Sequence, residues 1–176
     1  MTEVLVERRT ETPLADREVA AMAEAAGGCL DLHRVQWHGT LLSADGRELV
    51  CHFSAADLES VRMVIKTQGA LPGRVWACSS RDAPGLTSEK LAKANVLVSW
   101  AFEEPLGPDE LEAVSPNDNV CLVTHRIRLL RTFMANDRRR LVCLYLAADA
   151  ESVRIAMRDA KHPIERVWAF RRPLGV

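Results

Sequence analysis

Apolar residues follow two patterns along this chain, short continuous runs and spacings of three or four residues. In the first half, the runs predict four β-strands, at Val4–Val6, Val35–Ser43, Arg47–Ser54 and Arg74–Ala77. A helix with Asp16 as its N-cap is predicted after the first strand, since residues at helical spacing follow it: Val19, Met22, Ala23, Ala26, Leu30 and His33. A second helix, capped by Asp57, is predicted after the third strand, and Asp149 is the predicted cap of its equivalent in the second half. The order is therefore β-α-β-β-α-β.

The second half repeats this pattern. The segment Arg47–Arg62 returns as Arg139–Arg154, and an offset of 92 residues aligns the two halves from end to end without a gap. The same element order is predicted there, although Ser115–Asn119 contains a proline that should break the first helix. We interpret the chain as a tandem duplication. Its expected parts are a first repeat at 1–78, a linker at 79–94 and a second repeat at 95–176.

The order β-α-β-β-α-β is typical of the ferredoxin-like fold, a four-stranded antiparallel sheet with two helices on one face. The segment Leu141–Leu146 is apolar at every position, which favours a strand buried on both faces. Helices can cover only one of these faces. We therefore predict an α+β protein in which the sheets of two ferredoxin-like repeats pack together as an intrachain, pseudo-dimeric α+β barrel.

The pair Asp45-Gly46 is typical of a two-residue hairpin turn, which pairs Thr40 with Cys51 and His38 with Phe53. Since side chains alternate along a strand, His38, Thr40 and Cys51 should share one face. The matching face of the second half holds Leu130, Thr132, Met134, Leu141, Cys143 and Tyr145. Asp137-Arg138 replaces the turn there, so a different or longer loop is predicted.

Cys51 and Cys143 are either small buried apolar residues or thiolates acting as metal ligands or nucleophiles, with the His38 imidazolium lowering the pKa of the Cys51 thiol. Cys29 with His33, and Cys121 with His125, are pairs with a spacing of four residues, so each pair shares one helix face. Each pair can supply two metal ligands, or else pack in the core near a helix end. The candidate metal ligands are His38, Cys51, Cys143, Cys29, His33, Cys121 and His125. The candidate ligand-binding residues are Thr40, Thr132, Tyr145, Trp76 and Trp168, the two tryptophans having core packing as their alternative. No catalytic residue is identified.

Composition limits the function classes. With 176 residues, 48% of them hydrophobic and 27% charged, and a net charge of -1, the chain is an ordinary globular protein, and neither nucleic acid nor an anionic membrane is expected as a partner. It lacks a signal-peptide run and a segment of transmembrane length, so a cytoplasmic location is expected. Five cysteines without a Cys-x-x-Cys spacing indicate reduced thiols. We expect a monomer with an internal pseudo-two-fold axis, open to further association through other surfaces.

Both halves carry a recurring set of motifs. In the first they are Val4–Arg8, Pro13-Leu14, Cys29-Leu30 with His33, Ser43–Arg47, Cys51, the Ala56–Arg62 corner and Val75-Trp76. In the second they include Pro105-Leu106, Cys121-Leu122, His125, Cys143, Tyr145, Ala148–Arg154, His162-Pro163 and Val167-Trp168. As a set these resemble a bacterial domain-of-unknown-function family that includes a small nickel-binding protein. The resemblance implies a ferredoxin-like fold with barrel pairing.

The same resemblance implies a histidine in the opening strand of the nickel-binding member. Val4–Arg8 and Val96–Trp100 contain none, so that ligand set is not transferred. The expected function is binding of a small ligand or a soft metal in or beside the barrel, where imidazole and thiolate suit nickel, copper or zinc. Two alternatives remain: a cofactor-independent cyclase, isomerase or oxygenase acting on a small organic substrate, by fold analogy only, and an interaction module without chemistry.

Overall fold

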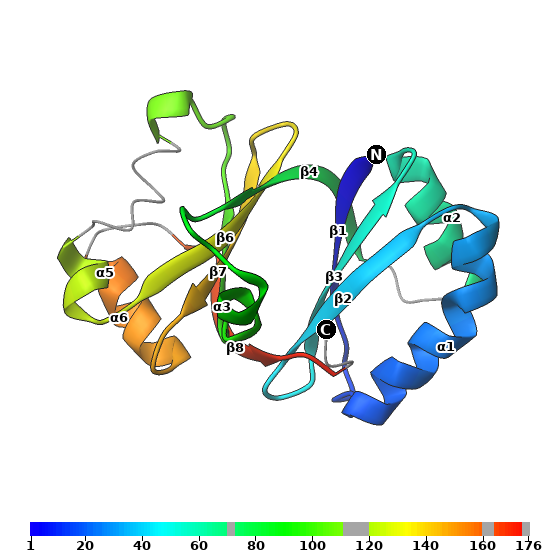
Figure 1. Ribbon diagram of the computed structural model, residues 1–176, viewed down its shortest axis with the longest axis horizontal. Helices are drawn as coiled ribbons and strands as arrows, with labels where there is room; N and C mark the ends of the chain where they lie inside the picture. Colours follow the sequence, from blue (N-terminus) through cyan, green and yellow to red (C-terminus); the bar gives the residue numbers. More distant parts are fainter. Residues whose placement is uncertain (70–72, 111–119, 160–163, 174–176) are drawn as a thin grey trace. The chain divides into compact units, whose positions relative to one another are not determined.

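The computed structural model describes residues 1–69, 73–110, 120–159 and 164–173 (Figure 1). The chain divides into two compact units, one formed by Met1–Cys78 with Phe170–Val176 and the other by Ser79–Ala169. Both are α+β. The helix break predicted at Ser115–Asn119 lies outside the described residues. Residues 79–94, the predicted linker, hold the end of strand β4 and the short helix α3, Ser88–Ala92.

The first unit is an antiparallel sheet with two helices against one face (Figure 1). Its strands are β1 (Thr2–Arg9), β2 (Gln36–Ser43), β3 (Glu48–Ala55) and β4 (Arg74–Asp82). They lie in the order β2-β3-β1-β4. The helices are α1 (Asp16–Leu32) and α2 (Leu58–Thr67). The elements follow the predicted order.

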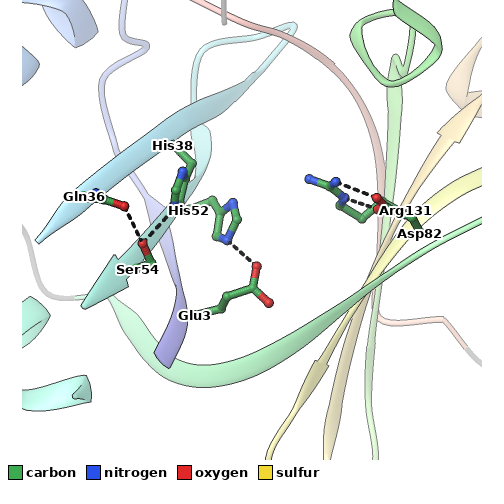
Figure 2. A network of polar contacts seen from close by, with 7 residues as sticks. All are labelled: Glu3, Gln36, His38, His52, Ser54, Asp82 and Arg131. Carbon is green, nitrogen blue, oxygen red and sulfur yellow. Dashed lines mark hydrogen bonds and ion pairs between the residues drawn. The ribbon is translucent and has the colours of Figure 1, made fainter. Parts of the chain in front are cut away.

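The second unit has the same element order in its described part. Its strands β5 (Val96–Ala101), β6 (Arg128–Ala135), β7 (Arg140–Leu146) and β8 (Arg166–Arg171) lie in the order β6-β7-β5-β8. Its helices are α5 (Val120–Thr124) and α6 (Ala150–Asp159). The ion pair of Arg131 with Asp82, with N–O distances of 2.5 and 3.0 Å, joins β6 to the end of β4 and lowers the pKa of the Asp82 carboxyl (Figure 2).

Two of the three predicted helix caps are confirmed. The Asp57 carboxylate accepts from the Ser60 amide at 2.8 Å, and Asp149 accepts from Ser152 in the same way at 2.7 Å. The prediction for α1 was wrong, since Ala15 is its N-cap. Glu18 accepts from the Ala15 amide and closes that helix end. Asp16, inside the helix, is left to pair with Arg171 at 2.6 Å.

In each unit the core lies between the sheet and its helices. Val4, Val6, Cys51 and Phe53 pack against Val61 and Val64 of α2 in the first unit. In the second, Val98, Trp100, Leu141, Cys143 and Tyr145 pack against Val153 and Met157 of α6. The opposite face of each sheet carries the alternate residues. The packing of the two sheets into one barrel stays a prediction, as does the duplication that it rests on.

The first hairpin keeps the predicted register, with Thr40 opposite Cys51 and Leu42 opposite Leu49. Its turn is not the predicted two-residue type, because only Gly46, with φ +73°, is left-handed, and its amide donates to the Ser43 carbonyl at 2.9 Å. The second unit has the same turn, with Arg138 at φ +56° donating to Ala135. The different or longer loop predicted there was therefore wrong.

A β-bulge changes the far end of both hairpins. The β2–β3 register shifts between Trp37 and Gly39, so Trp37, not His38, lies opposite Phe53. The extra residue moves His38 to the face without helices. The prediction that His38 shares a face with Cys51 was therefore wrong. The β6–β7 register shifts in the same way around Leu130, which was placed with Cys143 from the sequence.

Candidate metal centre

Two histidines meet on the helix-free face of the first unit's sheet (Figure 2). The ring centroids of His38 and His52 are 4.7 Å apart, with the rings tilted by 37°. His52 Nε2 lies 3.1 Å from Glu3 Oε1, and His38 Nε2 lies 2.8 Å from Ser54 Oγ. Ser54 Oγ in turn donates to Gln36 Oε1 at 3.3 Å. We call these five residues the histidine cluster.

The local backbone explains why the cluster forms. Ser54 lies directly opposite Glu3 on β1 and opposite Gln36 on β2. His52 precedes Ser54 by two residues and therefore points to the same face. The bulge at His38 supplies the second imidazole, which regular alternation would have placed on the helix side. Each member of the cluster thus owes its place to strand register.

These hydrogen bonds fit one tautomer of each neutral ring. A carboxylate only accepts, so His52 donates from Nε2 to Glu3, and the neutral ring then has its lone pair on Nδ1. Because the Ser54 hydroxyl donates to Gln36, His38 likewise donates from Nε2 and has its lone pair on Nδ1. An imidazole whose other nitrogen donates to a carboxylate or hydroxyl is the usual form of a metal-binding histidine.

The cluster can be reached from solvent. The side chain of His52 is 18% exposed and that of Glu3 is 30% exposed, while His38 is exposed. Cys78 lies opposite Glu3 on β4. Burial, and then the Glu3 carboxylate, raise the pKa of the Cys78 thiol to about 12. Cys78 is therefore a neutral thiol at neutral pH and a poor metal ligand.

Cys51 lies on the opposite face, under the helices, with its sulfur 3.0 Å from Thr40 Oγ1. Burial raises the pKa of this thiol, and the Thr40 hydrogen bond and the Arg8 charge act in the opposite direction. The sequence hypothesis of a thiolate activated by His38 is contradicted, since the imidazole lies on the other face. Cys51 fits the simpler interpretation, a small buried apolar residue.

Two candidates on the sheet of the second unit, Cys143 and Tyr145, lie in its core. Cys143 and Tyr145 are both fully buried, and burial, followed by the nearby Cys143, raises the pKa of Tyr145. Thr132, opposite Cys143, donates to the Arg81 carbonyl at 3.4 Å. The structure thus brings these three together, without an imidazole.

The two Cys-His pairs lie at the C-terminal ends of α1 and α5. His33 follows Cys29 at the C-cap, and its amide donates to the Cys29 carbonyl. His125 repeats this with Cys121, and its Nε2 lies 3.8 Å from Asp159 Oδ2. Within the described ranges, no group of three or more His, Cys, Asp or Glu side chains is arranged to hold a metal ion.

The two tryptophans proposed as ligand-binding residues lie on helix-free faces. Trp76 is buried and donates from Nε1 to Glu7 Oε1 at 2.7 Å. Trp168 is half-buried on β8, opposite Leu97. Trp76 therefore lies on the face of the sheet opposite Thr40 and Cys51.

The residues that the sequence interpretation missed are His52, Glu3, Ser54 and Gln36. The signal was present for His52, because the alternation of side chains along a strand places it on the face of the sheet opposite Cys51. A second signal was Gly39, with φ +147°, because a glycine inside a strand often marks a bulge. A bulge predicted from Gly39 would have placed His38 on the same face of the sheet as His52.

The thiols give a first prediction. Cys51, Cys78 and Cys143 are buried, whereas Cys29 and Cys121 are half-buried. With iodoacetamide at pH 8, Cys29 and Cys121 should react at least about 100-fold faster than the other three, since reaction needs an accessible thiolate. Peptide mass spectrometry over time measures this. Denatured protein, in which all five thiols should react alike, is the control, and rapid labelling of native Cys51 would contradict the account.

Solved structures show the class of fold. Of 27 chains that match, a mutant chlorite dismutase of Candidatus Nitrospira defluvii in complex with cyanide has a TM-score of 0.54 and 8% identity, over 97% of this chain and 91% of that chain. A candidate monooxygenase of Lactobacillus acidophilus has a TM-score of 0.44 and 9% identity, over 98% and 95%. The first likeness shows that the α+β fold is of the chlorite dismutase kind.

The family comparison is more specific. Residues 97–169 match the model of the family described as nickel responsive protein SCO4226-like. This confirms the resemblance to a family with a nickel-binding member for most of the second half. No curated protein matches the sequence. No helix among the described residues is long and apolar enough to cross a membrane.

Proposed function

We propose that this protein binds a divalent transition metal of the nickel type at His38 and His52. The observation that carries the proposal is the pair of imidazole rings 4.7 Å apart, each donating from Nε2 to an oxygen. Both imidazoles lie on the helix-free face of the sheet, where His38 is exposed and the His52 side chain is 18% exposed. Imidazole nitrogen suits nickel, copper and zinc better than calcium or magnesium.

The donors present fit such a metal by chemistry. His38 and His52 would hold it, while Glu3 and the Ser54–Gln36 pair would orient the rings. Three ligating side chains do not converge among the described residues. Water or a further ligand must therefore complete the coordination, and binding of moderate strength is expected.

The family match and the alignment of the two halves both bear on the proposal. The family matched by residues 97–169 is described as nickel responsive, which supports metal binding by this chain. At the offset of 92 residues, His38 and His52 correspond to Leu130 and Leu144, and Glu3 corresponds to Asn95. The proposed site therefore belongs to the first unit alone, and one metal ion per chain is expected.

The test is a nickel and zinc titration by isothermal calorimetry. The variant His38→Ala with His52→Ala should bind at least about 100-fold more weakly than wild type, since both nitrogen ligands are lost. Glu3→Gln should weaken binding about 10- to 100-fold while keeping the stoichiometry, as removal of an orienting partner does.

Two control variants separate this site from the other candidates. Cys51→Ala and His125→Ala should each leave nickel affinity unchanged within about threefold, because neither side chain is in the histidine cluster. Retention of stoichiometric nickel by the double histidine variant would contradict the proposal. Loss of nickel in His125→Ala instead would move the site to the end of α5.

The alternative expectation, a cofactor-independent enzyme, stays a prediction. The solved structures that suggest it are only 8% and 9% identical to this chain, and a likeness of that kind shows a fold and not a reaction. No described residue has been placed as a catalytic acid, base or nucleophile. The buried Cys51 and Cys78, whose thiol pKa values are raised, are poor nucleophiles.

A further inference from the structure

A cavity of about 380 Å³ lies in the first unit, on the face of the sheet that α1 and α2 cover. Residues of the two helices line one side of it, among them Val19, Leu30 and Val64. Residues of the sheet line the other side, among them Trp37, Cys51 and Phe53. A concave, mainly apolar space of this volume is typical of a small-molecule site.

The polar groups of the cavity are few. On the sheet side, the hydroxyl of Thr40 and the thiol of Cys51 bond to each other at 3.0 Å and need no further partner. Arg8 also lines the cavity, and its guanidinium charge acts on the buried Cys51 thiol. Its Nε is buried, and no described residue accepts a hydrogen bond from it. An arginine always carries its charge, so this nitrogen needs an acceptor.

The second unit carries a tryptophan at the position of Arg8. At the offset of 92 residues Arg8 corresponds to Trp100, and both occupy the same register, Arg8 opposite Leu49 and Trp100 opposite Leu141. Trp100 is only 1% exposed and belongs to the core cluster of its unit. In the second unit the indole of Trp100 packs between the sheet and the helices. In the first unit the equivalent place holds Arg8 beside a cavity.

We propose that this cavity binds a small amphipathic carboxylate, with its apolar body between the helices and the sheet and its carboxylate on Arg8. The apolar walls exclude a strongly hydrophilic ligand, because its polar groups would lose their hydration without partners. A carboxylate supplies the acceptor that Arg8 Nε lacks, and a charge-assisted bond to guanidinium is among the stronger hydrogen bonds in proteins. The histidine cluster lies on the opposite face and takes no part.

Naphthalene-2-carboxylate and its uncharged analogue 2-naphthalenemethanol are suitable probes, measured by isothermal calorimetry. Wild type should bind the carboxylate with a Kd below about 1 mM and at least tenfold more tightly than the alcohol. Arg8→Gln should lower the affinity for the carboxylate at least tenfold and leave that for the alcohol within threefold. Arg8→Trp, which copies the second unit, should abolish binding of both by filling the cavity.

Several outcomes would overturn the proposal. If wild type bound neither probe, the proposal that the cavity binds a small amphipathic carboxylate would be refuted. If wild type bound the two probes equally well, or if Arg8→Gln kept full affinity for the carboxylate, Arg8 would not be the group that binds the carboxylate. Retained binding in a folded Arg8→Trp would place the ligand elsewhere. Circular dichroism checks folding, and Arg8→Gln carries the test if Arg8→Trp does not fold. His38→Ala with His52→Ala should bind both probes as wild type does.

Discussion

Trp100→Ala is expected to lower the free energy of unfolding by about 3–5 kcal/mol, the usual cost of removing a large aromatic side chain from a core. Trp100 is 1% exposed and lies in a cluster with Leu141, Cys143, Val153 and Met157. Its removal would leave a cavity lined by side chains of both the sheet and α6. Urea denaturation followed by circular dichroism measures the change.

The control for this prediction is Arg8→Ala at the equivalent position of the first unit. Arg8 already borders a cavity and is only half-buried, so its truncation should cost less than about 1 kcal/mol. Similar costs for the two variants would contradict the account. They would mean that the space beside Arg8 is packed as tightly as that around Trp100.

Gly46→Ala is the second substitution with a large expected effect, about 2–5 kcal/mol of lost stability. Gly46 has φ +73°, a conformation that costs an L-residue about 1–2 kcal/mol. A Cβ built there would also lie 2.5 Å from the Leu14 carbonyl oxygen, which is backbone and cannot turn aside. Crowding of this kind costs about 1–3 kcal/mol.

Gly85→Ala separates these two contributions. Gly85 has φ +69°, and nothing lies within 4 Å of the place where its Cβ would be. It should therefore cost only the conformational part, about 1–2 kcal/mol. Thermal and urea unfolding of both variants give the comparison. If Gly46→Ala were no more destabilising than Gly85→Ala, the close approach of Leu14 to the turn would be refuted.

Local signals in the sequence predicted the elements well, because each signal acts over a few residues. Asp57 and Asp149 cap their helices because a carboxylate three residues before an amide is placed to accept from it. The register of the first hairpin followed from the position of its turn, even though the turn type differed. In both units, the carboxylate at the turn, Asp45 or Asp137, accepts from the amide two residues later. This bond can form with or without a glycine between them.

The candidate site could not be predicted as well, because it depends on the bulge at His38. A bulge moves one side chain to the other face and is set by sheet twist and packing beyond the hairpin. Gly39 marked it in the first unit, but Arg131 stands at the equivalent position of the second, where the same bulge occurs. The sequence therefore placed His38 with Cys51 and not with His52, and it offered a thiolate site where the structure has an imidazole pair.

The difference between Arg8 and Trp100 was visible in the aligned halves, since both stand in the opening strand at the same offset. The cavity beside Arg8 was not visible in the sequence, because it forms only when α1 and α2 pack on the sheet. Sequence alone gives the volumes of the two side chains but not the space around them. Packing between sheet and helices decides whether that space is filled.

The central claim, an imidazole site for a nickel-type metal, is tested most directly by nickel K-edge X-ray absorption of the protein loaded with one equivalent of nickel. The account predicts a first shell of nitrogen and oxygen atoms, with the multiple-scattering signature of imidazole and no sulfur, because the buried cysteine thiols lie outside the cluster. Loss of the imidazole signature in His38→Ala with His52→Ala would complete the assignment. A shell dominated by sulfur, or an imidazole signature that survives in that variant, would contradict it.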